Sequence, residues 1–175
     1  MRIDYRYFPY LMTDVIVNLR AIYDPDRNNY PYFEYGTYLE LVKQLEIKDK
    51  NQLESYPLVW LVWEANENNE KEIFDEMYSI SPRVFIVSPT EPDYSSAERF
   101  TNNFEAILNP IFQEFIYQVQ YHVNIDFAES NPFTKTDHLL WGESLGFAKD
   151  KNVLNCPVDA IEVKFNELLV CQRSN

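Results

Sequence analysis

The residues best suited to catalysis in this sequence are two histidines and two cysteines. His138 follows Asp137 directly, but neighbours on a strand point to opposite faces, so these two side chains do not form a dyad by themselves. Neither Cys156 nor Cys171 lies in a local catalytic signature, and two cysteines do not make a disulfide framework. An enzyme would therefore have to assemble its site in space, around His122 or His138, for example as a cysteine–histidine pair.

Motifs that bind cofactors or metals are absent from the sequence. It has no P-loop, GxGxxG, GxSxG or HExxH, and its three glycines argue against phosphate-binding loops. The turn DPDRNN at 24–29 begins with the acidic spacing of a calcium-binding loop. However, Asn29 stands where that loop needs glycine, and Tyr35 where it needs a bidentate glutamate. We therefore predict no catalytic residue, no cofactor and no metal.

The composition is acidic and rich in aromatic residues. The 175 residues include 28 Asp and Glu but only 15 Lys and Arg, which gives a net charge of −13. A protein that wraps nucleic acid needs Lys and Arg to displace counterions from phosphate, so this charge argues against such a function. The 13 tyrosines suit surfaces that are packed on one side and wet on the other, such as subunit interfaces. A tyrosine-rich core and surface without an interface would have the same composition.

Neither a signal peptide nor a transmembrane segment is predicted. Charged residues and Pro9 interrupt the first ten residues, and no run of about 18 apolar residues occurs. We expect a protein that is made in the cytoplasm and has no membrane partner.

The strongest periodic pattern covers residues 95–121 and predicts a long amphipathic helix. Ser95 and Glu98 have the spacing of a capping box at its start. Apolar residues at three- and four-residue intervals share one face, and the opposite face carries polar residues that include Arg99 and Asn103. Pro110 lies inside this pattern and removes a backbone donor. We therefore expect a kink near 106–109, or a break into two helices.

The remaining chain predicts one α+β domain over residues 1–175. A second amphipathic helix is expected at about 6–23, and residues 38–45 fit either a strand or a short helix. Short alternating or β-branched segments predict strands over 58–63, 83–87, 122–127, 160–165 and 168–171. We expect a small, mostly antiparallel sheet packed on the long kinked helix (95–121) and on the N-terminal helix.

Two extended loops are expected, at about 64–80 and 128–158. Long loops in compact domains usually carry function or contact a partner. The second loop contains three large apolar residues in a polar segment: Trp141, Leu145 and Phe147. They either fold back on the core or are presented to a neighbouring subunit, which makes them candidates for an interface.

Three blocks of sequence form a recognisable set. The first joins Tyr35-Gly36, Leu39-Glu40 and Leu45 to YPLVWL at 56–61. The second is ERFTNNFEAILNPIF at 98–112, and the third is DAIEVKFNELLV at 159–170. Together they resemble tail-terminator-like, or tail-completion, proteins of tailed bacteriophages that infect Bacteroidetes-type bacteria. The resemblance touches most of residues 30–170.

The resemblance implies a virion structural protein. Such a subunit assembles with itself as a hexameric or dodecameric ring at the head–tail junction or the top of the tail. It is located in the virion and, during assembly, in the host cytoplasm. It docks onto portal, adaptor or other neck and tail proteins, and DNA passes through the ring without specific binding. The family carries no catalytic residues, so none is transferred. The two extended loops depart from the family pattern and would also suit a neck ring of a short-tailed phage.

Two other classes of function fit the sequence. A small acidic binding module or regulator would act on a host or phage protein in one-to-one complexes. An enzyme would need a pocket with convergent polar groups near His122 or His138.

Overall fold

Two sheets and one long helix organise the described part of the chain. The computed structural model describes residues 7–22, 31–47, 56–63, 77–141 and 157–171. Its elements are α1 (Tyr7–Ile22), β1 (Tyr32–Gly36), α2 (Tyr38–Ile47), β2 (Leu58–Val62), β3 (Met77–Ile80), β4 (Arg83–Pro89), α3 (Ser96–Arg99), η2 (Phe100–Leu108), α4 (Asn109–Gln120), β5 (Ile125–Phe127), β6 (Phe133–Trp141), β7 (Val158–Phe165) and β8 (Leu168–Cys171). The predicted α+β class is confirmed.

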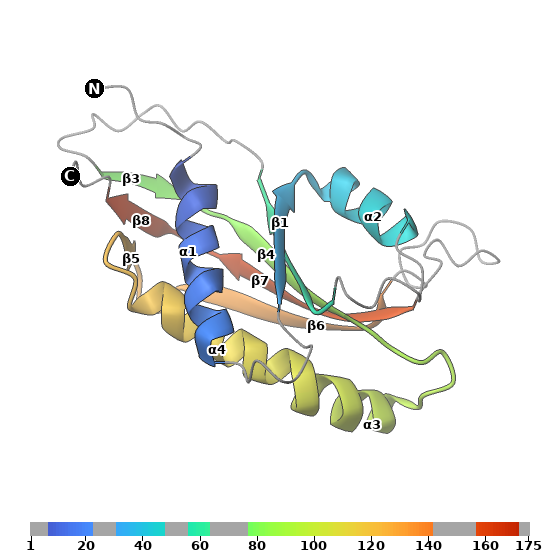
Figure 1. Ribbon diagram of the computed structural model, residues 1–175. Coiled ribbons are helices and arrows are strands. Elements are labelled where there is room, and N and C mark those ends of the chain that lie inside the picture. The colour runs from blue at the N-terminus through green and yellow to red at the C-terminus, as the bar shows by residue number, and fades with distance from the viewer. Residues whose placement is uncertain (1–6, 23–30, 48–55, 64–76, 142–156, 172–175) are drawn as a thin grey trace.

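The larger sheet has five strands in the order β1-β2-β4-β7-β6. Only β1 and β2 run parallel, and the other neighbours are antiparallel. The smaller sheet has the order β3-β8-β5 and is antiparallel throughout. Figure 1 shows the smaller sheet at one end of the molecule, beyond the ends of β4 and β7.

Two stretches of chain pass from one sheet into the other. β3 continues into β4 through Ser81 and Pro82, and β7 continues into β8 through Asn166 and Glu167. The second link has one more residue between paired positions, as in a β-bulge. Ser81 Oγ donates to the Asn166 carbonyl at 2.5 Å, and Phe165 N–H donates to the Pro82 carbonyl at 3.0 Å. These bonds hold the two bends together.

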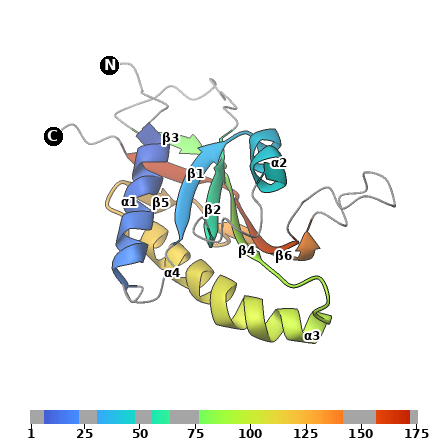
Figure 2. The same ribbon diagram turned by 45° about the vertical axis from the view of Figure 1, so that its right-hand side comes forward.

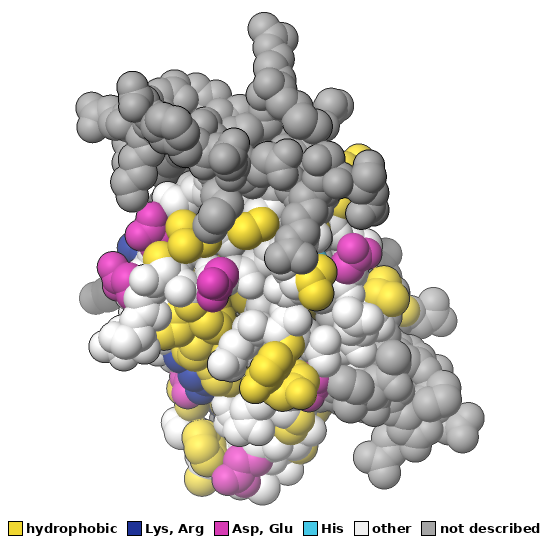
Figure 3. Space-filling model, turned by 90° about the vertical axis from the view of Figure 1, so that its left-hand side faces the viewer, with side chains coloured by type: hydrophobic (Ala, Val, Ile, Leu, Met, Phe, Trp, Pro, Cys, Tyr) yellow, Lys and Arg dark blue, Asp and Glu magenta, His cyan; other side chains and the backbone are white. Residues whose placement is uncertain are grey.

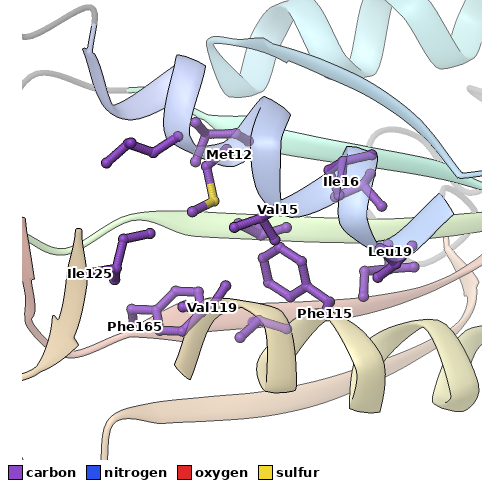
Figure 4. Close-up of a cluster of buried hydrophobic side chains, with 14 of the residues drawn as sticks. Met12, Val15, Ile16, Leu19, Phe115, Val119, Ile125 and Phe165 are labelled. Carbon is purple, nitrogen blue, oxygen red and sulfur yellow. The ribbon is translucent and has the colours of Figure 1, made fainter. Parts of the chain in front are cut away.

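One face of the larger sheet is covered by α1 and the long helix. Strand β2 is buried on both faces, which explains its continuous apolar sequence. The inner side chains of the sheet join buried residues of α1 and α4, and Figure 4 shows the two helices facing each other through this cluster. The labelled members are Met12, Val15, Ile16, Leu19, Phe115, Val119, Ile125 and Phe165.

The other face of the larger sheet is partly covered by α2 (Figure 2). Leu41 and Leu45 of this helix pack against Trp60 and other outer side chains of the sheet. The helix begins with a capping arrangement, in which Glu40 Oε2 accepts from Thr37 N–H at 2.7 Å and Thr37 Oγ1 accepts from Glu40 N–H at 3.2 Å. Of the two structures that the sequence allowed for residues 38–45, the helix is the one observed.

The long helix starts at the predicted capping box. Glu98 N–H donates to Ser95 Oγ at 3.3 Å, and Ser95 N–H donates to Glu98 Oε2 at 2.8 Å. The expected disturbance before Pro110 takes the form of π winding over Phe100–Leu108, in which Asn109 N–H bonds to the Phe104 carbonyl. Pro110 has no N–H to donate to the preceding turn. In the wider π winding ahead of it, backbone N–H groups bond to carbonyls five residues earlier. The ribbon continues through α4 without the break that was considered (Figure 1).

The predicted loops are wrong where strands replace them. Phe133–Trp141, inside the predicted loop 128–158, forms β6, and Met77–Ile80, inside 64–80, forms β3. The reason for the first error is that β6 is an edge strand with polar residues on both faces, so it lacks apolar alternation. The rest of both loops, at 64–76 and 142–156, and the turn 24–29 lie outside the described residues.

Candidate functional site

A buried polar network joins the start of the long helix to the end of the larger sheet. Asp159 of β7 is fully buried, and its carboxylate accepts from Asn103 Nδ2 at 2.8 Å and from Leu140 N–H at 2.8 Å. The Arg99 guanidinium lies 3.8 Å from the same carboxylate. The bond to Leu140 holds a residue with φ of 49° at the bulge in β6.

The other members of this network are also hydrogen-bonded. Arg99 donates to Thr90 Oγ1 and to the Pro92 carbonyl, both at 2.8 Å. Asn103 Nδ2 donates to the Pro89 carbonyl at 3.0 Å. A network of buried, hydrogen-bonded groups fixes the positions of the elements that it joins.

The burial of Arg99 and Asn103 corrects their predicted place on the solvent face of the helix. The start of the helix lies against β7, where the Asp159 carboxylate accepts from Asn103 and lies close to Arg99. Polar side chains that find such partners can be buried. Both residues and Asp159 belong to the second and third blocks of the resemblance.

His138 belongs to a polar and aromatic cluster on the outer face of the larger sheet. Its Nε2 lies 2.9 Å from Glu162 Oε2, and the other oxygen of Glu162 lies 3.3 Å from Arg83 Nε. The Arg83 guanidinium is 5.0 Å from the Tyr38 ring and 5.1 Å from the Phe85 ring. Burial raises the pKa of the Tyr38 hydroxyl, and the nearby Arg83 charge opposes this shift. Arg83 thus supplies a cation to both aromatic rings and a charge partner to Glu162.

Of the two alternatives stated for Trp141, folding back on the core is the one observed. Its side chain is 4% exposed and stacks on Phe85 with ring centroids 4.8 Å apart. The other two interface candidates, Leu145 and Phe147, lie outside the described residues.

His122 lies in a different layer, at the end of α4. Its Nδ1 accepts from Asn124 N–H at 3.2 Å, which requires the neutral form at that atom. Burial lowers the pKa of His122, and the Asp14 carboxylate partly offsets that effect. His122 lies near Asp14 of α1, whereas His138 lies with Glu162 and Trp141 on the outer face of the larger sheet, so the structure does not bring the two histidines together.

No cluster of metal-binding side chains occurs among the described residues. The same part of the chain holds no helix that is long and apolar enough to cross a membrane.

An open groove of about 530 Å³ lies beside β1, between α1 and α2. Aliphatic and aromatic side chains make up part of its wall, and Glu40 and Gln44 of α2 add a carboxylate and an amide. The lining residues are Thr13, Ile16, Val17, Phe33, Glu34, Tyr35, Glu40, Gln44 and Trp60. The indole N–H of Trp60 is buried and has no hydrogen-bond partner in the described structure.

Exposed apolar side chains are frequent on α1, β1 and α2, the elements that border this groove. Among the eleven large hydrophobic residues that are exposed in the described structure, six belong to α1, β1 and α2: Tyr10, Val17, Tyr32, Tyr35, Leu39 and Ile47. We call these six residues and the groove the β1-side surface. Aromatic side chains, such as the tyrosines in this set, are enriched at contact sites between proteins.

Acidic side chains are more evident than basic ones among the described residues on the face shown in Figure 3. On the face shown in Figure 3, hydrophobic side chains lie among acidic ones and few Lys or Arg side chains are seen. No basic patch suited to phosphate appears on this face.

Comparison with models of known protein families gives no match, and comparison with curated proteins gives none either.

Proposed function

We propose that this protein is a structural subunit of a tailed-bacteriophage virion. It assembles with itself as a ring at the head–tail junction or the top of the tail. The observation that carries the proposal is the β1-side surface, an open groove together with six exposed apolar residues on the elements that border it, of which Val17 and Tyr35 line the groove. Burial of apolar surface is the main driving force for association between subunits.

The residues that carry the phage resemblance support a structural role. Asp159, Arg99 and Asn103 form the buried network. Gly36 lies against Trp60 and Glu40, where a Cβ atom would collide with both side chains. These residues determine how the elements are joined and do not converge on an open polar pocket, as catalytic residues would.

The charge of the chain suits a ring through which DNA moves. A net charge of −13 in each subunit is multiplied by the number of subunits. An acidic inner wall repels phosphate and lets DNA pass without binding, an effect that added salt weakens. Portal, adaptor or other neck and tail proteins would contact the faces of the ring.

The test compares assembly of the wild type with that of two variants, Val17→Glu and Tyr35→Glu. These side chains are 53% and 55% exposed, so the fold should survive while a buried carboxylate disrupts the contact. Sedimentation velocity and electron microscopy, with and without candidate portal and adaptor proteins, should show rings for the wild type and none for the variants.

The matched control is Val123→Glu, because Val123 is 74% exposed and lies outside the β1-side surface. It should assemble like the wild type. A wild-type chain that remains a monomer and binds no neck or tail protein would rule out the proposal.

A small acidic binding module is the second candidate, and the groove favours it. Its apolar wall residues suit an extended segment of a single partner protein. Such a module forms one-to-one complexes, so the stoichiometry of a purified complex separates the two functions.

A further inference from the structure

Strand β6 forms the edge of the larger sheet opposite β1. It is nine residues long and pairs with β7 on one side only. Within the described structure, the backbone groups of Phe133–Leu139 that point away from β7 have no hydrogen-bond partner. An uncovered row of N–H and C=O groups is a template for pairing with another strand.

The side chains of β6 restrict which strand can pair with it. On the helix side of the sheet, an aromatic residue, a cation and an anion follow one another at alternate positions: Phe133, Lys135 and Asp137. Lys135 Nζ lies 2.6 Å from Asp137 Oδ1, and both side chains are partly exposed. Charged side chains on the inner face of an edge strand disfavour most partners, because an arbitrary strand places apolar or like-charged side chains opposite them.

We propose that β6 pairs antiparallel with β6 of a second copy of this chain, about a twofold axis at Thr136. In this register Lys135 lies opposite Asp137 of the second copy, and Phe133 lies opposite its Leu139. Both contacts occur twice because the axis repeats them. Cross-strand neighbours of opposite charge and paired apolar residues stabilise such a ladder.

The alternation of faces excludes the neighbouring registers. A slip of one residue would pair the inner face of one sheet with the outer face of the other. A slip of two residues would place Lys135 opposite Lys135, or Asp137 opposite Asp137. Like charges directly opposite each other are unfavourable, so the strand specifies its own partner and register.

An apolar strip beside this edge gives the contact additional area. Phe133 packs edge-to-face on Phe112 of α4 with ring centroids 5.8 Å apart, and both rings are only partly buried. Lys135 Nζ lies 5.3 Å from the Phe112 ring. When the sheet of a second copy continues past β6, the helices of both copies lie on the same face of the joined sheet. The second copy would then cover these rings.

This contact goes beyond the proposed function, because it uses the edge opposite the β1-side surface and joins identical patches. Contacts that close a cyclic ring join two different patches. A chain that makes both kinds of contact forms paired rings with an even number of subunits. A chain that makes only the β6 contact stops at a dimer.

The decisive experiment uses two charge reversals, Lys135→Asp and Asp137→Lys. Each variant places like charges across the axis, so each alone should raise the dimer dissociation constant at least tenfold in sedimentation equilibrium. An equimolar mixture restores complementarity, because the acidic strand of one variant pairs with the basic strand of the other. The mixture should therefore form dimers as the wild type does. If the two residues acted only through the Lys135–Asp137 ion pair within one chain, mixing the variants would not restore dimer formation.

The controls are Lys43→Asp and Asp93→Lys, which make the same charge changes at exposed positions away from β6. Both should dimerise normally. Amide hydrogen exchange of the wild type is a second test. Exchange over Phe133–Leu139 should slow as protein concentration rises, because dimer formation bonds the backbone N–H groups of β6. A wild-type monomer at 100 µM-scale concentrations (roughly the weak end of specific association), particles with an odd number of subunits, or a mixture that stays monomeric would overturn the proposal. Dimers that never form rings with neck proteins would support it and reject only the proposed function.

Discussion

At the scale of single residues, the most informative group is the Asp159 carboxylate. Its partners Arg99 and Asn103 have the four-residue spacing that places them on the same face of a helix. That spacing is visible in the sequence, but hydrophobicity assigned the face to solvent. Polarity alone cannot signal burial where acceptors come from a distant strand. The network could therefore have been predicted only with knowledge of where β7 lies.

Replacing Asp159 with Asn should destabilise the fold strongly. The change keeps the shape but leaves the Arg99 guanidinium buried without an opposite charge. Removing one partner of a buried ion pair costs about 3 kcal/mol or more, and urea unfolding followed by circular dichroism measures the loss. Asp93→Asn, at an exposed turn, should stay within about 0.5 kcal/mol of the wild type. Equal stability of the two variants would show that the network contributes little.

At the scale of elements, strong local signals predicted the structure well. The capping box and apolar stripe predicted the long helix, and both are observed. A similar signal, Thr37 followed three residues later by Glu40, would have identified α2 as a helix. Edge strands β1 and β6 gave no such signal, because their sequences lack clean apolar alternation. Their pairing depends on neighbours far away in the chain.

Replacing Gly36 with Ala tests how β1 and α2 are joined. The new Cβ would lie 2.6 Å from Glu40 Oε2 and 2.9 Å from Trp60, so the cap or the core must shift. We expect a loss of about 1–3 kcal/mol in the free energy of unfolding. Adding Trp60→Phe removes the second collision, so the double variant should lose less than the sum of the two single changes. Strict additivity in a double-mutant cycle would contradict this explanation.

At the scale of the whole molecule, fold class and charge were predictable from composition and pattern, whereas surfaces were not. The α+β class follows from periodicity, which is a local property. The β1-side surface and the β6 edge depend on strand order, which no local pattern specifies. Trp141 illustrates the difference: a large apolar residue in a polar segment suits an interface and a core equally, and its stacking on Phe85 places it in the core.

The net charge of −13 predicts that the isolated protein does not bind DNA. Neither single- nor double-stranded DNA should change its electrophoretic mobility, even at about 20 mM salt, where phosphate contacts are strongest. The measurement should be repeated on any ring that forms. A mobility shift that disappears as salt is raised would reveal a basic site and contradict an acidic conduit.

The two stretches of chain that bend from one sheet into the other have a mechanical consequence. Because β3–β4 and β7–β8 are each continuous, a load applied to the small sheet reaches the large one along covalent backbone. The bonds at Ser81 and Pro82 keep the two bends side by side under such a load. The two sheets therefore cannot separate without breaking these bonds, and the subunit transmits tension through both sheets together.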